Sequence, residues 1–451
     1  MISVSQLARL GLFDARVPRY TSYPTAPHFS EGVGAGHVAE WLSAVTPGAR
    51  LSLYVHIPFC RRLCWFCACR TQGTATAAPV AGYVEVLKHE LEMLARHLPA
   101  GVRLSQLHWG GGTPTLLSPE MMLDLASAIR VAIPLAEDAE ISVEVDPNEI
   151  DEVRLDALAE IGLSRASIGV QDFDPEIQKI IGREQSFEVT AAAVEGLRAR
   201  GITSLNTDIL FGLPNQNRKK ITESVQKLLS LSPDRVALYG YAHVPWMARR
   251  QTLIPSDLLP TPEERLRLFE TARRLFLWDD YDEIGIDHFA RKGDKMAIAM
   301  REGTLRRNFQ GYTVDDGEAL IGVGASAISR YPQGYAQNDP GTGRYAKAIG
   351  TGQFATTRGH AFAGEDLARA RLIEQIMCTF RTDRAELERD FGAKPSWLDA
   401  LFDDARAQFG EVLRACPGGF EIVPEGRPLA RIVARALDVY ALDRAGHSPA
   451  I

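Results

Sequence analysis

Short β-rich runs alternate with longer helical patterns over most of the chain, and this alternation is the strongest constraint on the fold. The expected strands are mostly near-continuous apolar runs, which is typical of a parallel sheet covered on both faces. They cover residues 51–57, 104–109, 139–145, 163–170, 204–210, 235–241 and 282–289. Between the first two, Val84, Leu87, Leu91, Leu94 and Leu98 recur every three or four residues, which marks the buried face of a helix. Repeated βα units predict an α/β fold with a parallel barrel, complete or partial.

Composition shifts at both ends of this pattern predict four regions. We expect an N-terminal arm over 1–49, because its stretch RYTSYPTAPHF is too rich in proline and polar residues for a regular element. The barrel follows over 50–330. A junction loop over 331–360 is expected from the glycines and turn formers of YPQGYAQNDPGTGRY. A smaller, mainly helical C-terminal domain then covers 361–451.

The charge and the cysteine content restrict the function classes. The formal net charge is −7, and acidic residues gather in the C-terminal region, so a nucleic-acid partner is not expected. No apolar stretch approaches the ~20 residues that cross a membrane, and the N-terminus lacks the apolar run and cleavage site of a secretory signal. We therefore expect a cytoplasmic protein without membrane contact. Its six cysteines are expected to be reduced thiols rather than disulfides.

Four of these cysteines lie close together in HIPFCRRLCWFCACR, residues 56–70. Cys60, Cys64 and Cys67 have the spacing C-x3-C-x2-C. A zinc site or a row of buried thiols is the simpler interpretation, but zinc usually takes four ligands in two separated pairs, and no second pair occurs. Three close thiolates suit a cubane 4Fe–4S cluster that leaves one iron open for a substrate or cofactor. Cys378 and Cys416 are isolated and are expected to be structural.

Glycine or polar residues follow several of the expected strands. HWGGGTPT places three glycines, Gly110 to Gly112, after the second strand, where they let the backbone approach a ligand closely. Residues near the ends of later strands are Glu144, Gln171, Asp208, Tyr241 and Ala242. Singly, such residues are most simply helix caps or turn formers. Together, at the carboxyl ends of parallel strands, they predict the active face of a barrel.

These motifs resemble those of the radical S-adenosylmethionine (SAM) superfamily, whose cluster motif is matched by Cys60, Cys64 and Cys67. The resemblance implies a partial parallel barrel of the radical SAM type. In that superfamily the open iron binds the amino and carboxylate groups of SAM, and an electron from the cluster splits a C–S bond. More narrowly, nearly the whole chain is similar to the oxygen-independent coproporphyrinogen III oxidases. The matching motifs, in the family's order, are PRYTSYPTAPHF, HIPFC-RRLC-WFC-AC, HWGGGTPT, EVDP, GVQDF, YAHVPWM, GIDHFA and NFQGYT.

The resemblance implies two SAM molecules, one on the cluster and one beside it. The residues implied for the first SAM are Tyr54, Gly110, Glu144 and Ile328. Those implied for the second are Phe66, Gly111, Gly112, Gln171, Arg183, Asp208 and Ala242.

The fourth cysteine of the loop, Cys69, belongs to the family's C-x-C ending, which lies near the cofactors without binding iron. Its simpler interpretation is a spare thiol. The family often has Gly-Cys-Asn-Lys here, whereas this chain has Ala68-Cys69-Arg70-Thr71, which leaves the local contacts of Arg70 open. Tyr20 and Tyr23 are expected to close the arm over the substrate, and Tyr20 is a catalytic candidate together with Cys69.

The implied reaction converts two propionate side chains of coproporphyrinogen III into vinyl groups. It yields protoporphyrinogen IX, carbon dioxide, methionine and 5′-deoxyadenosine. Implied partners are the substrate and a reduced electron donor of the flavodoxin or ferredoxin type, and a monomer is expected. Because the substrate carries several carboxylates, its pocket should contain arginines, with Arg19, Arg249, Arg250, Arg306 and Arg307 as candidates.

Three alternatives stay open at this point. A haem chaperone paralogue shares the cluster motif, but such paralogues typically lack RYTSYPT and have Phe at the position of Cys69. A radical enzyme of haem degradation or methyl transfer shares much of the core. A cluster-dependent regulator would place the C-terminal region on DNA, which the acidic residues of that region disfavour.

Overall fold

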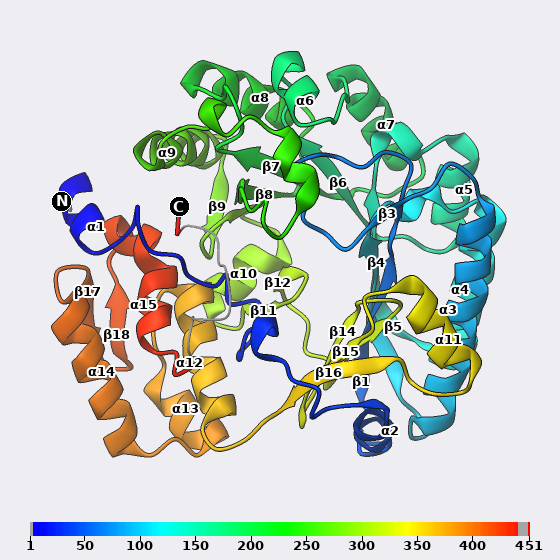
Figure 1. Cartoon of the computed structure of the whole chain (residues 1–451). Helices are drawn as coiled ribbons and strands as arrows, with labels where there is room; N and C mark the ends of the chain where they lie inside the picture. The colour runs from blue at the N-terminus through cyan, green and yellow to red at the C-terminus, as the bar shows by residue number, and fades with distance from the viewer. Residues whose placement is uncertain (1–2, 441–449) are drawn as a thin grey trace.

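The computed structural model describes residues 3–440 and 450–451, so residues 1–2 of the expected arm and 441–449 of the expected C-terminal domain lie outside the description. Within the described residues, twelve strands form one curved sheet in the order β16-β15-β14-β13-β1-β4-β5-β6-β7-β8-β10-β9 (Figure 1). Their bounds are β1 Arg50–Ile57, β4 Arg103–Gly111, β5 Leu135–Val145, β6 Arg165–Gln171, β7 Ser204–Phe211, β8 Arg235–Gly240, β9 Tyr281–Ile284, β10 His288–Arg291, β13 Ala319–Val323, β14 Ile328–Tyr331, β15 Gly334–Asn338 and β16 Thr356–Ala361.

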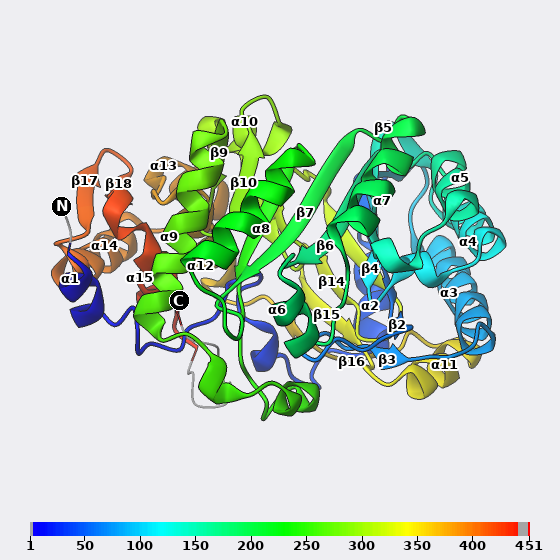
Figure 2. The ribbon, with the colours of Figure 1, turned by 90° about the horizontal axis from the view of Figure 1, so that it is seen from above.

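The strands from β13 through β8 pair in parallel, and antiparallel strands extend the sheet at both edges. Helices cover the outside of the parallel strands, as Figure 2 shows from above. These are α3 Ala78–His97, α4 Pro119–Ala132, α5 Glu152–Glu160, α6 Pro175–Ile180, α7 Phe187–Ala199, α8 Arg218–Ser230 and α9 Pro262–Trp278. The expected partial parallel barrel is confirmed.

Local sequence explains how these helices begin and which face they bury. On α3, Val84, Leu87, Leu91 and Leu94 are buried against the sheet, as their spacing predicted. Helix α9 begins with a capping box in which Thr261 accepts from the Glu264 N–H and the Glu264 carboxylate accepts from the Thr261 N–H. Among the described helices, none combines the length and apolar character that crossing a membrane requires.

Two expectations about the later strands are wrong. Residues 282–289 form two antiparallel strands, β9 and β10, because Gly285 has a positive φ of 53° and turns the chain between them. Residues 331–360 are not a loop, because β15, β16 and α11 (Thr342–Gly350) occupy most of them. Tyr335 and Ala336 are buried in β15, and their apolar signal was hidden among the surrounding turn formers.

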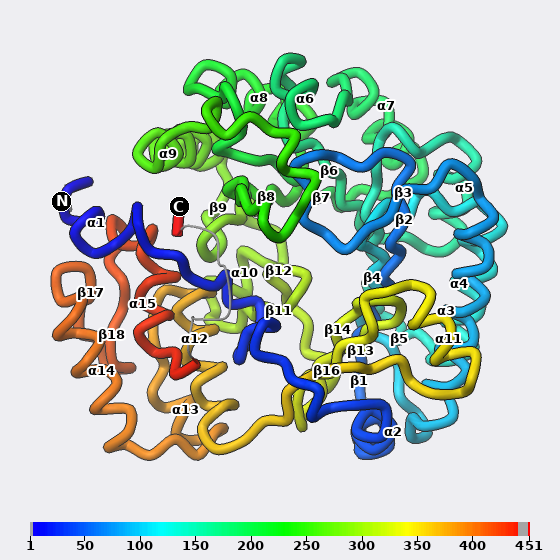
Figure 3. The backbone as a smooth tube through the Cα atoms, in the orientation of Figure 1, coloured from blue at the N-terminus to red at the C-terminus, as the bar shows by residue number. Residues whose placement is uncertain are grey.

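The arm joins the two halves of the molecule. It contains α1 (Val4–Arg9) and α2 (Ala35–Ser43), and Figure 3 follows it from α1 beside the C-terminal helices to α2 near β1. The C-terminal elements are α12 Asp366–Thr379, α13 Arg384–Phe391, α14 Pro395–Phe409, β17 Leu413–Cys416, β18 Gly419–Ile422 and α15 Ala430–Ala436. They share a core that also contains Leu7, Leu12 and Val17 of the arm. The arm therefore packs with the C-terminal helices, while the domain boundaries themselves stay a prediction.

Candidate active site

The cysteine loop leaves the carboxyl end of β1 and is closed at its base. Strands β2 (Phe59–Cys60) and β3 (Gln72–Gly73) pair in parallel. The Gln72 N–H donates to Pro58 O at 2.7 Å, and the Thr74 N–H donates to Cys60 O at 3.0 Å. These bonds fix where the loop begins and ends and leave its cysteines between them.

The far side of the loop is held by residues at the end of α6 and by a short helical turn that follows β8. The Trp65 N–H donates to Ile181 O at 2.9 Å, and Gly182 lies so close that a Cβ there would meet the Trp65 ring at 2.9 Å. Gln251 Nε2 donates to Phe66 O at 2.7 Å and to Ala242 O at 3.1 Å. Gln251 therefore holds Phe66 and Ala242, both expected at the second SAM, close to each other.

Every cysteine of the chain lies in the described residues and is free of disulfides. Burial raises the pKa of Cys60 to about 11. The pKa of Cys67 lies lower, at about 6, because the thiol and the N–H of Cys69 donate to its sulfur. Burial is the larger effect on the Cys64 thiol and keeps its pKa above the usual value, although Arg183 Nη1, 3.6 Å from Cys64 Sγ, acts to lower that pKa. Nearby positive charge and N–H donors favour thiolates, and thiolates are the form that binds iron.

These donors fit a 4Fe–4S cluster. Among the described residues, no three His, Cys, Asp or Glu side chains are placed as ligands of one metal ion. A cubane takes each cysteine on a different iron, so its ligands need not converge on one point. Arg183 Nε is buried and has no hydrogen-bond partner in the described part of the chain, so a polar donor beside Cys64 is left for a bound group.

The three glycines at the end of β4, Gly110 to Gly112, are required by protein packing as well as by any ligand. A Cβ on Gly111, whose φ is +109°, would lie 2.5 Å from the His56 ring, and one on Gly112 would lie 2.5 Å from Phe59 O. The Gly111 N–H donates to Glu144 Oε2 at 3.0 Å, and a Cβ on Gly110 would meet Glu144 Oε1 at 2.7 Å. The glycines and Glu144 therefore form one surface below the cysteine loop.

Two histidines complete this surface, and sequence reasoning missed both. His108 Nε2 lies 3.6 Å from Glu144 Oε1, and the His108 ring stacks on Tyr54 with centroids 5.8 Å apart. The Tyr54 hydroxyl lies 3.0 Å from His56 Nδ1. The available signal was spacing, because His56 follows Tyr54 by two residues and His108 precedes Gly110 by two, which places each pair on one face of its strand.

The position of Glu144 controls its charge. Its depth in the barrel acts to raise its pKa, but the nearby His108 ring and the hydrogen bond from the Gly111 N–H outweigh this effect and hold the pKa below the usual range. Its side chain is still 43% accessible. Glu144 is therefore an ionised carboxylate with free acceptor capacity, suited to a cationic or N–H-bearing ligand.

A second polar group lies at the ends of β6 and β7. A Cβ on Gly169 would lie 3.2 Å from both Arg183 Nη2 and Gln171 Nε2, so these two side chains converge. Asn206 Nδ2 donates to Asp208 Oδ1 at 3.0 Å. Burial and the charge of Glu144 raise the pKa of Asp208 to about 6.

The remaining expected residues divide between the site and its surroundings. Ile328 packs its backbone against Gly322, whose β13 position pairs with Tyr54, so it lies beside the Glu144 surface. Tyr20 lies apart, because its hydroxyl donates to Asp438 Oδ2 at 2.9 Å and its ring is buried among the arm and C-terminal residues. Its catalytic role stays a prediction.

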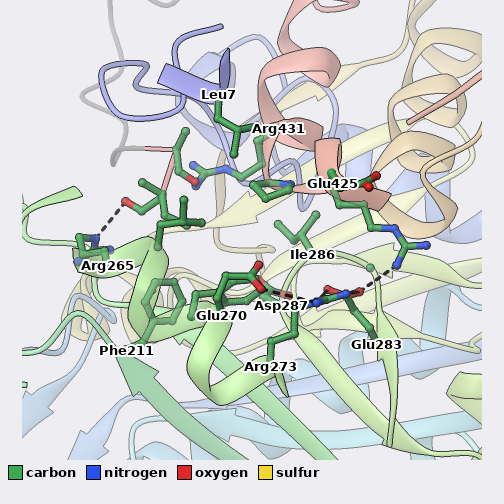
Figure 4. A pocket seen from close by; sticks show the side chains of 18 of the residues that line it. Leu7, Phe211, Arg265, Glu270, Arg273, Glu283, Ile286, Asp287, Glu425 and Arg431 are labelled. Atoms are coloured by element: carbon green, nitrogen blue, oxygen red, sulfur yellow. Dashed lines mark hydrogen bonds and ion pairs between the residues drawn. The ribbon is translucent and has the colours of Figure 1, made fainter. Parts of the chain in front are cut away.

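A groove of about 470 Å³ lies at the edge of the barrel, between α9, the β9–β10 turn and the C-terminal segment (Figure 4). Glu283 forms ion pairs with Arg273 and Arg427 along one wall. Arg19 and Ala242 reach its lining, whereas none of the cysteines does. The groove is therefore a neighbour of the cysteine site rather than its centre.

Comparison with known proteins agrees with this geometry. A model of the Radical SAM superfamily matches residues 54–228. The oxygen-independent coproporphyrinogen III oxidase of Paracoccus denitrificans is 64% identical over 447 residues, 99% of each sequence, and a protein of the same name from Cereibacter sphaeroides is 58% identical over 98% of each. The solved coproporphyrinogen III oxidase of Escherichia coli, a radical SAM enzyme, matches with a TM-score of 0.90 at 37% identity, covering 94% of this chain and 97% of that one. The chain belongs to the family of oxygen-independent coproporphyrinogen III oxidases.

Proposed function

We propose that this protein converts two propionate side chains of coproporphyrinogen III into vinyl groups without oxygen, giving protoporphyrinogen IX for haem biosynthesis. The observation that carries this proposal is the cysteine loop held above Glu144 and the glycine surface, in a chain 64% identical to a named oxidase over 99% of both sequences. With a 4Fe–4S cluster and SAM bound, the site would gain reductive cleavage of SAM to a radical that removes hydrogen from a propionate β-carbon. Each vinyl group is then completed by loss of carbon dioxide and of one electron, which passes to an external one-electron acceptor.

The residues of the loop and the strand ends have distinct proposed roles. Cys60, Cys64 and Cys67 hold three irons and leave the fourth to SAM. The ionised Glu144 accepts N–H groups of the first SAM, beside Gly110, Tyr54 and Ile328. Support for Glu144 comes from its low pKa and its accessible side chain.

A second SAM is proposed on the other side of the site. Its residues would be Phe66, Gly111, Gly112, Gln171, Arg183, Asp208 and Ala242. The proposal is supported by the convergence of Arg183 with Gln171 and by the unpartnered Nε of Arg183 within the described residues. Asp208 would accept a hydroxyl or amine of this molecule once it has lost its proton.

Cys69 and Tyr20 are proposed to serve the substrate rather than the iron. Cys69 is accessible, and its N–H donates to Cys67 Sγ, so it lies next to a ligand without needing to be one. Tyr20 lines a cavity with other residues of the arm, where it helps to exclude water from the bound substrate. The electron is proposed to come from a reduced carrier of the flavodoxin or ferredoxin type, and the protein is proposed to act as a monomer.

The test is anaerobic turnover of reconstituted protein with coproporphyrinogen III, SAM and a chemical reductant. Two molecules of carbon dioxide and two of 5′-deoxyadenosine should form for each protoporphyrinogen IX, because each vinyl group needs one hydrogen abstraction. Cys416→Ser is the matched control for loop variants, since Cys416 lies in the remote β17–β18 hairpin. Haem binding without turnover under these conditions would instead identify a chaperone.

A further inference from the structure

A second cavity lies where the arm crosses the open edge of the barrel. It measures about 500 Å³ and is enclosed by arm residues 20–23, the hairpin of β11 (Arg306–Asn308) and β12 (Gly311–Thr313), and α12. We call it the arm cavity. Its size suits part of a large ligand.

One cation in the arm cavity has donors that the protein does not use. Nε and Nη1 of Arg307 are buried and have no hydrogen-bond partner among the described residues. The guanidinium lies over the Tyr312 ring, 4.4 Å from its centroid, and the charge of Asp287 acts on it, but neither interaction satisfies these two N–H donors. A buried guanidinium without acceptors is unfavourable, so this position favours binding of an anion.

The neighbouring arginine provides an internal contrast. Arg306 Nη1 lies 3.6 Å from a carboxylate oxygen of Glu374 and 3.6 Å from one of Glu386. It lines the same cavity and carries the same charge, but α12 and α13 already supply its counter-ions. Of these two candidate arginines, Arg307 is therefore the one with capacity for a ligand.

The hairpin that carries Arg307 also lies near the end of β8. A Cβ on Gly311, the first residue of β12, would lie 3.7 Å from the Tyr239 hydroxyl. Burial, together with the charges of Asp208 and Asp287, raises the pKa of Tyr239, and the charges of Arg307 and Arg19 act against this. Tyr239 thus lies within electrostatic reach of both Asp208, proposed at the second SAM, and Arg307.

We propose that Arg307 binds, in the arm cavity, a propionate carboxylate that coproporphyrinogen III keeps in the product. This inference rests on the proposed function. A bidentate ion pair stabilises the carboxylate anion and would oppose its loss as neutral carbon dioxide, so it suits a group that anchors the substrate and not one that reacts. Arg307 is then a specificity residue that positions the macrocycle.

The experiment measures porphyrin binding to Arg307→Gln under air-free conditions, with two probes that differ in their carboxylates. Coproporphyrin III has all four propionates, whereas mesoporphyrin IX has only the two that the product retains and has ethyl groups elsewhere. We expect the Kd for both probes to rise by about 10- to 100-fold, since each loses the same charged hydrogen bonds. The KM for coproporphyrinogen III should rise in parallel, with kcat changed less.

Arg414→Gln, at an exposed ion pair in the remote β17–β18 hairpin, is the matched control and should leave both Kd values and KM within about twofold of the wild type. Arg307→Lys should recover part of the affinity, which separates a charge effect from misfolding, and retained cluster absorbance reports an intact loop. Weakened binding of coproporphyrin III alone would place Arg307 on a carboxylate that is lost and overturn the inference. Unchanged Kd and KM in Arg307→Gln would show that Arg307 does not bind the substrate. A wild-type protein that binds porphyrin without turnover would instead contradict the proposed function.

Discussion

Two carboxylates inside this protein face opposite situations. Glu90 on α3 is 2% exposed, and it accepts hydrogen bonds from the Gly324 N–H at 2.8 Å, the Asn338 amide at 2.8 Å and the Tyr345 hydroxyl at 2.5 Å. Glu144 on β5 accepts one backbone hydrogen bond, faces His108 and stays 43% accessible. The Glu90 carboxylate accepts all its hydrogen bonds from protein groups, whereas the Glu144 carboxylate can still accept hydrogen bonds from a ligand.

The difference separates a structural group from a functional one. Burial raises the pKa of Glu90 in spite of its hydrogen bonds, whereas His108 and the Gly111 N–H lower that of Glu144. The two regions are nevertheless connected, because Tyr83, beside Glu90, donates to His56 O at 3.0 Å. The hydrogen-bonded group around Glu90 and Tyr83 therefore supports the end of β1. The cysteine loop and the Glu144 surface, which keep free acceptors, follow directly from this strand end.

The largest effect is expected at the loop. Cys64→Ala should abolish the cluster absorbance and all turnover, because a cubane with two protein ligands is not retained. Cys69→Ala should keep the absorbance and lose turnover. The free energy of unfolding of the cluster-free protein should stay within about 1 kcal/mol in both variants, since the loop cysteines hold no core contact. Iron content, visible spectra and urea unfolding check this, and bleaching in Cys69→Ala would reverse the assigned roles.

Glu90→Gln should show the opposite pattern. In the variant, an amide NH2 group replaces one carboxylate oxygen and faces protein donors that point at oxygen in the wild type. We therefore expect a loss of about 2–3 kcal/mol in the free energy of unfolding. The exposed Glu92→Gln on the same helix is the control and should change little. Urea denaturation of the two variants measures the difference. If Glu90→Gln left the free energy of unfolding unchanged, the hydrogen bonds that Glu90 accepts would not be what distinguishes the two carboxylates.

Glu144→Gln should affect ligand binding and leave stability unchanged. Loss of the anion should weaken SAM binding by about tenfold, while urea unfolding of the cluster-free protein stays within about 0.5 kcal/mol, because the side chain is accessible. Equilibrium dialysis with labelled SAM, beside Glu137→Gln on the same strand, measures it. Equal affinity in the two variants would argue against Glu144 as a SAM ligand.

Asp208→Asn should give an effect on stability that depends on pH. The folded pKa of Asp208 is about 6, raised from the ordinary 3.8, so its stabilising contribution is present at low pH and is lost as pH rises through 6. An amide does not ionise, so the variant avoids this pH-dependent loss of stability, and its side-chain oxygen can still accept the hydrogen bond from Asn206. We expect the variant to gain about 1–2 kcal/mol of unfolding free energy at pH 8 and roughly half of that at pH 5. A pH-independent gain would show that Asp208 is not protonated in the folded apoprotein.

Much of the barrel could be predicted from sequence, because its elements depend on local pattern. Continuous apolar runs marked β1 and β4 through β8, and the three- and four-residue spacing marked the buried face of α3. β13 was not predicted, although every residue of Ala319–Val323 is buried, because no strong helical pattern precedes it in the sequence. Its place beside β1 is set by pairing with a strand some 270 positions earlier.

The chemical groups of the site were also visible in the sequence, since side-chain identity and the βα order together decide what reaches the active end of the barrel. The spacing of Cys60, Cys64 and Cys67 and the glycines at the end of β4 could be recognised without the structure. The role of His56 against Gly111 did, because it arises from two different strands packed side by side.

The sequence by itself determined the thiols, the glycines and the strand-end carboxylates, because each is a local choice of residue at a position fixed by the repeating pattern. Only the tertiary structure decided which groups are satisfied and which are left open. Glu90 accepts a hydrogen bond from Tyr345, 255 residues away, whereas Glu144 stays accessible and two donors of Arg307 have no partner among the described residues. Hydrogen-bond saturation depends on distant partners meeting in space, and no local pattern records it.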